Sequence, residues 1–125
     1  MFKAMIIAGI GGFIGTCFRF LTGKLCHMIT DSPFPYGTLT VNLVGSFIIG
    51  LLFGLAEKND MLSTQMNVLL ITGFCGGFTT FSSMADDMYL LIEQRQWLSF
   101  GSYTLLSFVL GVMLVWAGRS LIKAS

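Results

Sequence analysis

The chain reads Gly73-Phe74-Cys75-Gly76-Gly77-Phe78-Thr79-Thr80-Phe81-Ser82-Ser83 inside a long apolar run, where a continuous membrane helix would otherwise be expected. Glycine weakens a helix through backbone entropy, and serine and threonine compete for the backbone hydrogen bonds of a helix. We therefore predict that the membrane helix breaks between residues 73 and 83. A break at membrane depth persists only where protein or a water-filled path satisfies the freed backbone groups, so this stretch is the first candidate for a functional site.

The composition places the whole chain in a membrane. Hydrophobic residues make up 54% of its 125 residues, charged residues make up 10%, and the mean hydropathy is +0.81. A soluble domain carries roughly 25% charged residues. The length suits one domain over residues 1–125, and a net charge of +1 gives no basic footprint for nucleic acid.

Four apolar segments predict an all-α membrane protein with four transmembrane helices. They cover about residues 4–21, 37–56, 66–92 and 97–118, and each is long enough to cross a hydrocarbon core of roughly 30 Å. The third is longer than one straight span requires, which fits two half-helices joined by a break at residues 73–83. We expect a loop from Thr22 to Tyr36 and a short polar connection from Glu57 to Asp60.

Small residues recur on the first two helices. Gly11 and Gly15 form a GxxxG pair, and Gly45, Gly50 and Gly54 give the second helix a similar face. In lipid, small residues at such spacings let helix backbones approach closely.

Two polar residues of these helices have two readings each. Arg19 is either a snorkelling arginine at the membrane interface or a cation at the mouth of an anion path. Asn42 either forms a hydrogen bond between helices or contacts a ligand.

Asp86 and Asp87 are expected near a membrane–water boundary. The three cysteines, Cys17, Cys26 and Cys75, show no metal or disulfide spacing, and His27 is expected in an interfacial loop.

The distribution of cations gives a weak orientation signal. Four spans place both termini on the same side of the membrane. The four cations expected on that side are Lys3, Lys58, Arg119 and Lys123, and the three cations expected on the other side are Arg19, Lys24 and Arg95. The positive-inside bias is therefore small. Such a chain is expected to insert both ways round and to pair as an antiparallel, dual-topology homodimer, the geometry that many transporters build from inverted repeats.

The predicted spans contain several side chains that can donate hydrogen bonds at membrane depth. They are Thr38, Asn42, Thr79, Thr80, Ser82, Ser83, Tyr103 and Ser107. Hydroxyl and amide groups donate to anions, and the edge of an aromatic ring such as that of Phe81 is electropositive. Many weak donors suit a small anion that must be held and then released.

Three other classes of function make different demands on the sequence. A proton-coupled multidrug exporter needs a carboxylate in its first helix, and residues 4–21 contain none. A membrane scaffold held by GxxxG packing predicts that Asn42 and Phe81 are replaceable. A membrane enzyme needs a nucleophile and a base, and no such pair is visible, so we expect that the chain is not an enzyme.

Three segments resemble a known family. Residues 11–19, 37–47 and 73–82 are similar to the signature segments of the Fluc (CrcB-type) fluoride channels, and the resemblance covers essentially the whole chain. It implies passive export of fluoride across a bacterial inner membrane through two pores of an antiparallel homodimer. It also implies a structural Na⁺ on the two-fold axis, held by the backbone carbonyls of Gly76 and Thr79.

The resemblance also implies roles for side chains. The pore phenylalanine and the pore asparagine correspond to Phe81 and Asn42, Arg19 corresponds to an arginine in the vestibule, and Asp87 stands where glutamate is more usual. A track of hydroxyl groups corresponds to Thr38, Ser82, Ser83, Tyr103 and Ser107.

Met84 departs from the family pattern. The family reads TTFSTF, with a second pore phenylalanine three residues after the first, and Met84 occupies that position here. Methionine is flexible and polarizable but lacks an electropositive ring edge. Either conduction tolerates the change, with Met84 filling space while Phe81, Asn42 and the hydroxyl groups remain, or this chain conducts differently; we favour the first alternative.

Overall fold

The fold was taken from a computed structural model that describes residues 1–30, 32, 34–58 and 63–124. Parts of the expected loop from Thr22 to Tyr36 and of the expected polar connection from Glu57 to Asp60 lie outside these residues. The structure contains α1 (Phe2–Ile29), α2 (Tyr36–Glu57), α3 (Thr64–Asn67), η1 (Val68–Cys75), α4 (Gly76–Phe78), α5 (Ser82–Glu93), α6 (Trp97–Leu105), η2 (Leu106–Leu110) and α7 (Gly111–Ala124), of which η1 and η2 are π-helical.

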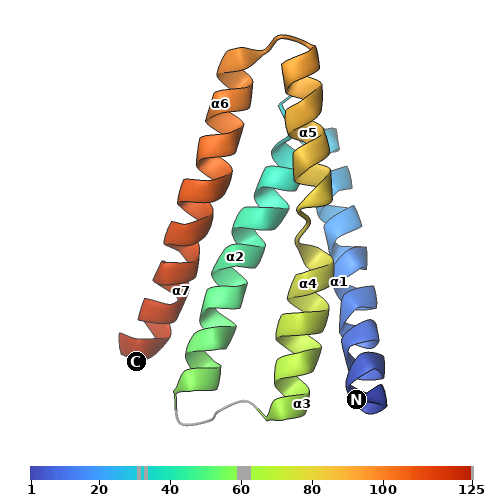
Figure 1. Cartoon of the computed structure of the whole chain (residues 1–125), viewed down its shortest axis with the longest axis vertical. Coiled ribbons are helices and arrows are strands. Elements are labelled where there is room, and N and C mark those ends of the chain that lie inside the picture. The colour runs from blue at the N-terminus through green and yellow to red at the C-terminus, as the bar shows by residue number, and fades with distance from the viewer. Residues whose placement is uncertain (31, 33, 59–62, 125) are drawn as a thin grey trace.

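These elements form four spans. The spans are Phe2–Ile29, Tyr36–Glu57, Thr64–Glu93 and Trp97–Ala124, and each is long and apolar enough to cross a membrane. They confirm the predicted all-α fold with four membrane helices. The two termini lie at the same end of the molecule (Figure 1).

The first helix is longer than predicted. It continues to Ile29, so the expected loop from Thr22 is wrong for residues 22–29. Leu21, Leu25 and Ile29 recur every four residues and continue the apolar face of the helix. At 1.5 Å per residue, its 28 residues extend roughly 42 Å, which exceeds the hydrocarbon core.

Glycines bring α1 against the first half of the third span; the GxxxG spacing predicted a close approach of helix backbones but not which helix is the partner. A Cβ atom on Gly11 would lie 2.9 Å from the Phe74 amide nitrogen, and one on Gly15 would lie 2.9 Å from that of Phe78. A Cβ atom on Gly73 would lie 2.7 Å from the Ala8 carbonyl oxygen. These positions admit no larger side chain unless a backbone moves.

A second glycine contact joins α2 to α7. Gly118 packs on the α2 backbone. The fourth helix continues past it to Ala124 instead of ending at the predicted residue 118. Arg119 Nη1 lies 2.5 Å from Glu57 Oε1, and the Arg119 guanidinium lies 4.9 Å from the centre of the Phe53 ring. This end of the molecule is thus held by backbone packing and by one ion pair.

We expect Gly118→Ala to destabilise the protein. The new Cβ atom would lie 2.6 Å from the Phe47 carbonyl oxygen and 2.8 Å from the Leu51 amide nitrogen, and such overpacking costs roughly 1–3 kcal/mol. Gly101→Ala is the matched control on the same span, because no described residue lies within 4 Å of its Cβ position. Unfolding in detergent should show a loss of stability for Gly118→Ala alone. Equal stability of the two variants would contradict the packing.

The third span has a non-helical segment at residues 79–81, which we call the link. Thr79 is extended, with φ −84° and ψ 160°, and α5 begins at Ser82 (Figure 1). The sequence predicted a wider interruption, over residues 73–83. Gly73 and Gly77 instead stay within helical segments, because their lack of a side chain is used for contact with α1.

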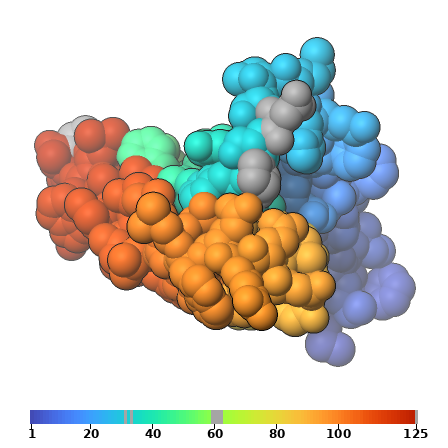
Figure 2. Space-filling model, turned by 90° about the horizontal axis from the view of Figure 1, so that it is seen from above, coloured from blue at the N-terminus to red at the C-terminus, as the bar shows by residue number. Residues whose placement is uncertain are grey.

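Much of each span faces outward. Only 6–28% of the residues in the apolar core of each span are buried. Seen end on, α1 and α7 lie on opposite sides of an elongated molecule (Figure 2). Lipid or another protein chain must therefore cover most of the apolar surface.

Candidate functional site

Asn42 of α2 is bonded to the link. Its Nδ2 donates to the Thr80 carbonyl oxygen at 2.9 Å, and the Thr80 amide donates to its Oδ1 at 2.9 Å. This reciprocal pair satisfies both backbone groups of a non-helical residue at membrane depth. Of the two readings of Asn42, the structure shows the hydrogen bond between helices.

The link removes the helical donors of the Gly76 and Thr79 carbonyl groups. In a continuous helix the Thr80 amide would donate to the Gly76 carbonyl, and the Ser83 amide would donate to the Thr79 carbonyl. Here the Thr80 amide donates to Asn42, and the Ser83 amide donates to Thr80 Oγ1 at 3.3 Å. The carbonyl oxygens of Gly76 and Thr79 thereby lose their helical donors. Gly76 is exposed, and a Cβ atom there would have nothing within 4 Å among the described residues.

Side chains from three spans surround a hollow of about 270 Å³ beside the link, which we call the central hollow. The predicted site residues along it are Asn42, Thr79, Phe81, Met84 and Ser107. The sequence did not single out a further lining residue, Phe108. The one signal in the sequence is its place next to Ser107, which is a predicted donor.

Ser107 lines the central hollow and carries an unused donor beside it. Its Oγ is buried and has no hydrogen-bond partner among the described residues. It lies in the π-helical segment η2, a kind of distortion that frequently occurs at functional sites. A buried hydroxyl without a partner is unfavourable in an apolar protein, so its retention here points to a ligand.

Phe81 and Met84 border the same hollow differently. Phe81 is 70% exposed, whereas Met84 is 6% exposed and packs with Leu39, Leu91 and Tyr103. The Met84 sulfur lies 3.9 Å from Asn42 Nδ2, within reach of a weak hydrogen bond. Met84 therefore fills the core and faces the asparagine amide at the same time.

A smaller hollow of about 80 Å³ lies on the other side of the link. It brings together Arg19, Thr38, Thr80 and Ser83. Arg19 Nε donates to the Gly77 carbonyl oxygen at 3.0 Å. The arginine is thus partly buried and bonded to protein.

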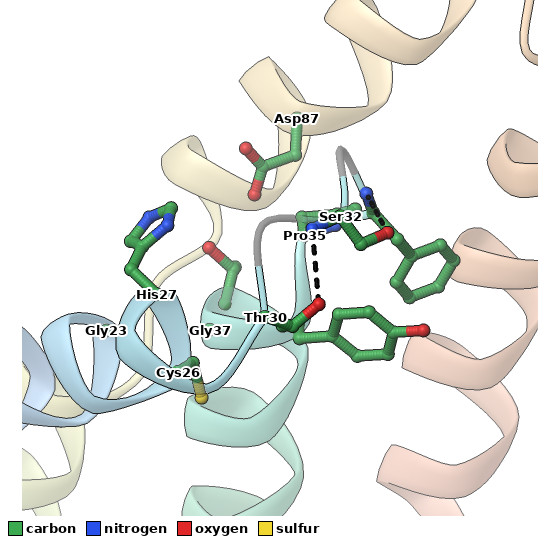
Figure 3. A pocket seen from close by; sticks show the side chains of 11 residues that line it. Gly23, Cys26, His27, Thr30, Ser32, Pro35, Gly37 and Asp87 are labelled. Carbon is green, nitrogen blue, oxygen red and sulfur yellow. Dashed lines mark hydrogen bonds between the residues drawn. The ribbon is translucent and has the colours of Figure 1, made fainter.

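A third hollow, of about 230 Å³, lies between the end of α1, the start of α2 and α5. Asp87, His27 and Thr38 line it, and Figure 3 shows the Asp87 carboxylate and the His27 ring facing this space from opposite helices. His27 belongs to the last turns of α1, so its expected place in a loop is corrected. Thr38 lines both this hollow and the smaller one, which makes them neighbours.

The structure does not bring all the predicted hydroxyl groups together. Tyr103 is fully buried, and its hydroxyl donates to Asp87 Oδ2 at 3.3 Å. Ser107, one turn later, faces the central hollow instead. Ser82 is exposed and lines none of the three hollows. The Thr79 hydroxyl donates within its own helix, to the Cys75 carbonyl oxygen at 2.8 Å.

Comparison with known proteins gives the family. The family model described as CrcB-like protein, Camphor Resistance (CrcB), matches residues 6–119. The chain belongs to the CrcB-like family. This membership confirms the resemblance seen in the sequence.

Relatives in the CrcB-like family carry the name fluoride-specific ion channel FluC. One from Vibrio campbellii is 41% identical over 116 residues, which cover 93% of this chain and 91% of the relative. One from Methylobacillus flagellatus is 40% identical over 124 residues, with 98% and 96% covered. One from Nitratidesulfovibrio vulgaris is 36% identical over 116 residues, with 93% and 94% covered. The name describes an ion channel, in agreement with the expectation that this chain is not an enzyme.

Proposed function

We propose that this chain forms a fluoride-selective channel that lets F⁻ leave the cytoplasm passively across a bacterial inner membrane. The relatives named as fluoride channels support the choice of ion. The observation that carries the proposal is the central hollow, which Asn42, Phe81 and Ser107 line and beside which the Ser107 hydroxyl has no partner among the described residues. Hydrogen fluoride that enters from acid surroundings dissociates inside the cell, so an open path for F⁻ suffices to remove it.

Fluoride coordination in this proposal uses several weak donors. The Ser107 hydroxyl has no partner among the described residues. The Met84 sulfur lies 3.9 Å from Asn42 Nδ2, and a thioether is a weak acceptor for its second amide hydrogen. The exposed edge of Phe81 adds a positive ring edge. Such donors bind a dehydrated anion without the deep well that a full charge would create, so the ion is able to leave.

The proposed functional unit is an antiparallel homodimer with two pores. Gly76 and Phe81 are exposed beside the link, and the low burial of all four spans leaves an apolar surface for a second chain. Both termini lie at one end, and the small cation bias expected from the sequence favours insertion in both orientations. A partner related by a two-fold axis in the membrane plane closes the hollow at Phe81.

The proposed Na⁺ site uses backbone oxygen atoms. The carbonyls of Gly76 and Thr79 lack their helical donors, and carbonyls of unwound helices are suitable ligands for Na⁺ in membrane proteins. Two carbonyls from each chain give four oxygen atoms around a two-fold axis without a buried carboxylate. When bound, the ion supplies positive charge that compensates these oxygens and joins the two chains.

Ser107→Ala tests this function. Purified protein in liposomes should release fluoride down its gradient, and the variant should do so about tenfold more slowly, since a hydrogen bond to a charged group is worth roughly 1.5–3 kcal/mol. Its thermal stability should stay equal or rise, because the lost hydroxyl has no partner in the described part of the chain. Ser102→Ala, at an exposed serine of the same span, is the control. Wild-type rates in Ser107→Ala would remove Ser107 from the path.

A further inference from the structure

Arg19 reaches the third span at the end of its first half. Its Nε donates to the Gly77 carbonyl oxygen at 3.0 Å, across 58 residues of sequence. In a continuous helix this carbonyl would accept from the Phe81 amide, which belongs to the non-helical link. Arg19 thus replaces a backbone donor that the interruption removes.

The Gly77 carbonyl lies between two groups with a proposed function. Gly76 precedes it and Thr79 follows two residues later, and their carbonyls are the proposed Na⁺ ligands. On the far side of Thr79, Asn42 holds the amide and the carbonyl of Thr80. The chain around the Gly76 and Thr79 carbonyls is therefore held by two side chains, Arg19 of α1 at Gly77 and Asn42 of α2 at Thr80.

We propose that Arg19 is a positioning residue for the Gly76 and Thr79 carbonyls, and that it acts through its Nε–H donor. The inference rests on the Na⁺ site of the proposed function. A carbonyl near the end of a helix attracts a donor and a positive charge, so Arg19 also suits the dipole of η1 and α4. Without this donor the Gly77 peptide rotates more freely, and the neighbouring carbonyls lose their fixed spacing.

Three substitutions separate the donor from the charge. In Arg19→Gln the side-chain nitrogen stands the same number of bonds from Cα as Nε, so it keeps an N–H donor without the charge. Arg19→Met has a similar shape and neither property. Arg19→Lys keeps the charge but places its nitrogen one bond farther away. Lys24→Gln, at an exposed cation of the same helix, is the control for loss of charge alone.

Two measurements decide the proposal. The first is amide hydrogen exchange at residues 79–81 in detergent-solubilised protein. The second is the Na⁺ concentration that gives half of the maximal thermal stabilisation, with N-methylglucamine replacing Na⁺. We expect faster exchange and a roughly tenfold higher Na⁺ requirement in Arg19→Met, the size of effect of one hydrogen bond, and near wild-type values in Arg19→Gln and Lys24→Gln.

The opposite pattern overturns the proposal. If Arg19→Gln behaves like Arg19→Met while Arg19→Lys behaves like wild type, the charge is what matters. If exchange at residues 79–81 is the same in all variants, Arg19 does not hold the link. A wild type whose stability ignores Na⁺ contradicts the proposed cation site and, with it, the positioning of its ligands. Fluoride efflux by that wild type would show that the channel itself survives.

Discussion

Asn42→Leu is expected to reduce fluoride efflux to the background of protein-free liposomes. Leucine removes the two hydrogen bonds, each 2.9 Å long, that hold the Thr80 amide and carbonyl. It leaves both backbone groups unpaired at membrane depth and deletes a donor from the central hollow. The unpaired groups should lower the free energy of unfolding by about 2–4 kcal/mol. Efflux is measured with a fluoride electrode, and stability by denaturation in detergent.

Asn67→Leu is the matched control for this prediction. Asn67 is the other asparagine in the described part of the membrane spans, and its Oδ1 is buried without a partner there. The substitution should leave stability equal or higher and leave efflux unchanged. Fluoride efflux at the wild-type rate in Asn42→Leu would show that conduction needs neither the hydrogen bonds from Asn42 to Thr80 nor a contact between Asn42 and the ion.

Phe81→Ile is expected to stop efflux without unfolding the protein. The side chain is 70% exposed in the single chain, so its truncation opens no large cavity in the core. Isoleucine keeps an apolar side chain but has no electropositive ring edge to offer an anion. Fluoride efflux should fall to background, while the melting temperature in detergent should stay close to that of the wild type.

Phe2→Ile supplies the comparison for Phe81→Ile. Phe2 is 75% exposed at the first residue of α1 and lines none of the three hollows. It should conduct as the wild type does. Normal efflux in Phe81→Ile would remove Phe81 from the pore, and a collapse of stability would show that its role is structural instead.

The sequence predicted the spans because hydropathy and length suffice to recognise them. It misplaced the end of α1, since Lys24 and His27 were read as loop residues although Leu25 and Ile29 continue the helical periodicity. It predicted a non-helical segment inside residues 73–83, but not that Gly73 and Gly77 remain helical. A glycine used for close packing and a glycine that weakens a helix look the same in sequence.

The candidate site was predictable as a set of residue types but not as a set of partners. Asn42 had two interpretations that only the position of Thr80 could separate. Tyr103 and Ser107 share a helix face by spacing, yet α5 supplies Asp87 as the acceptor for Tyr103, whereas Ser107 lines the central hollow. The bond from Arg19 to Gly77 joins residues 58 positions apart, and no local pattern reports such a contact.

Simultaneous efflux of fluoride and chloride from the same vesicles tests the central claim most directly. Liposomes that contain purified protein and equal concentrations of both salts are diluted into a medium free of both, with a potassium ionophore to carry the balancing charge. Two ion-selective electrodes then record both anions. The account predicts rapid release of fluoride, with chloride retained at the level of protein-free liposomes. Equal release of the two anions, or retention of both, would contradict it.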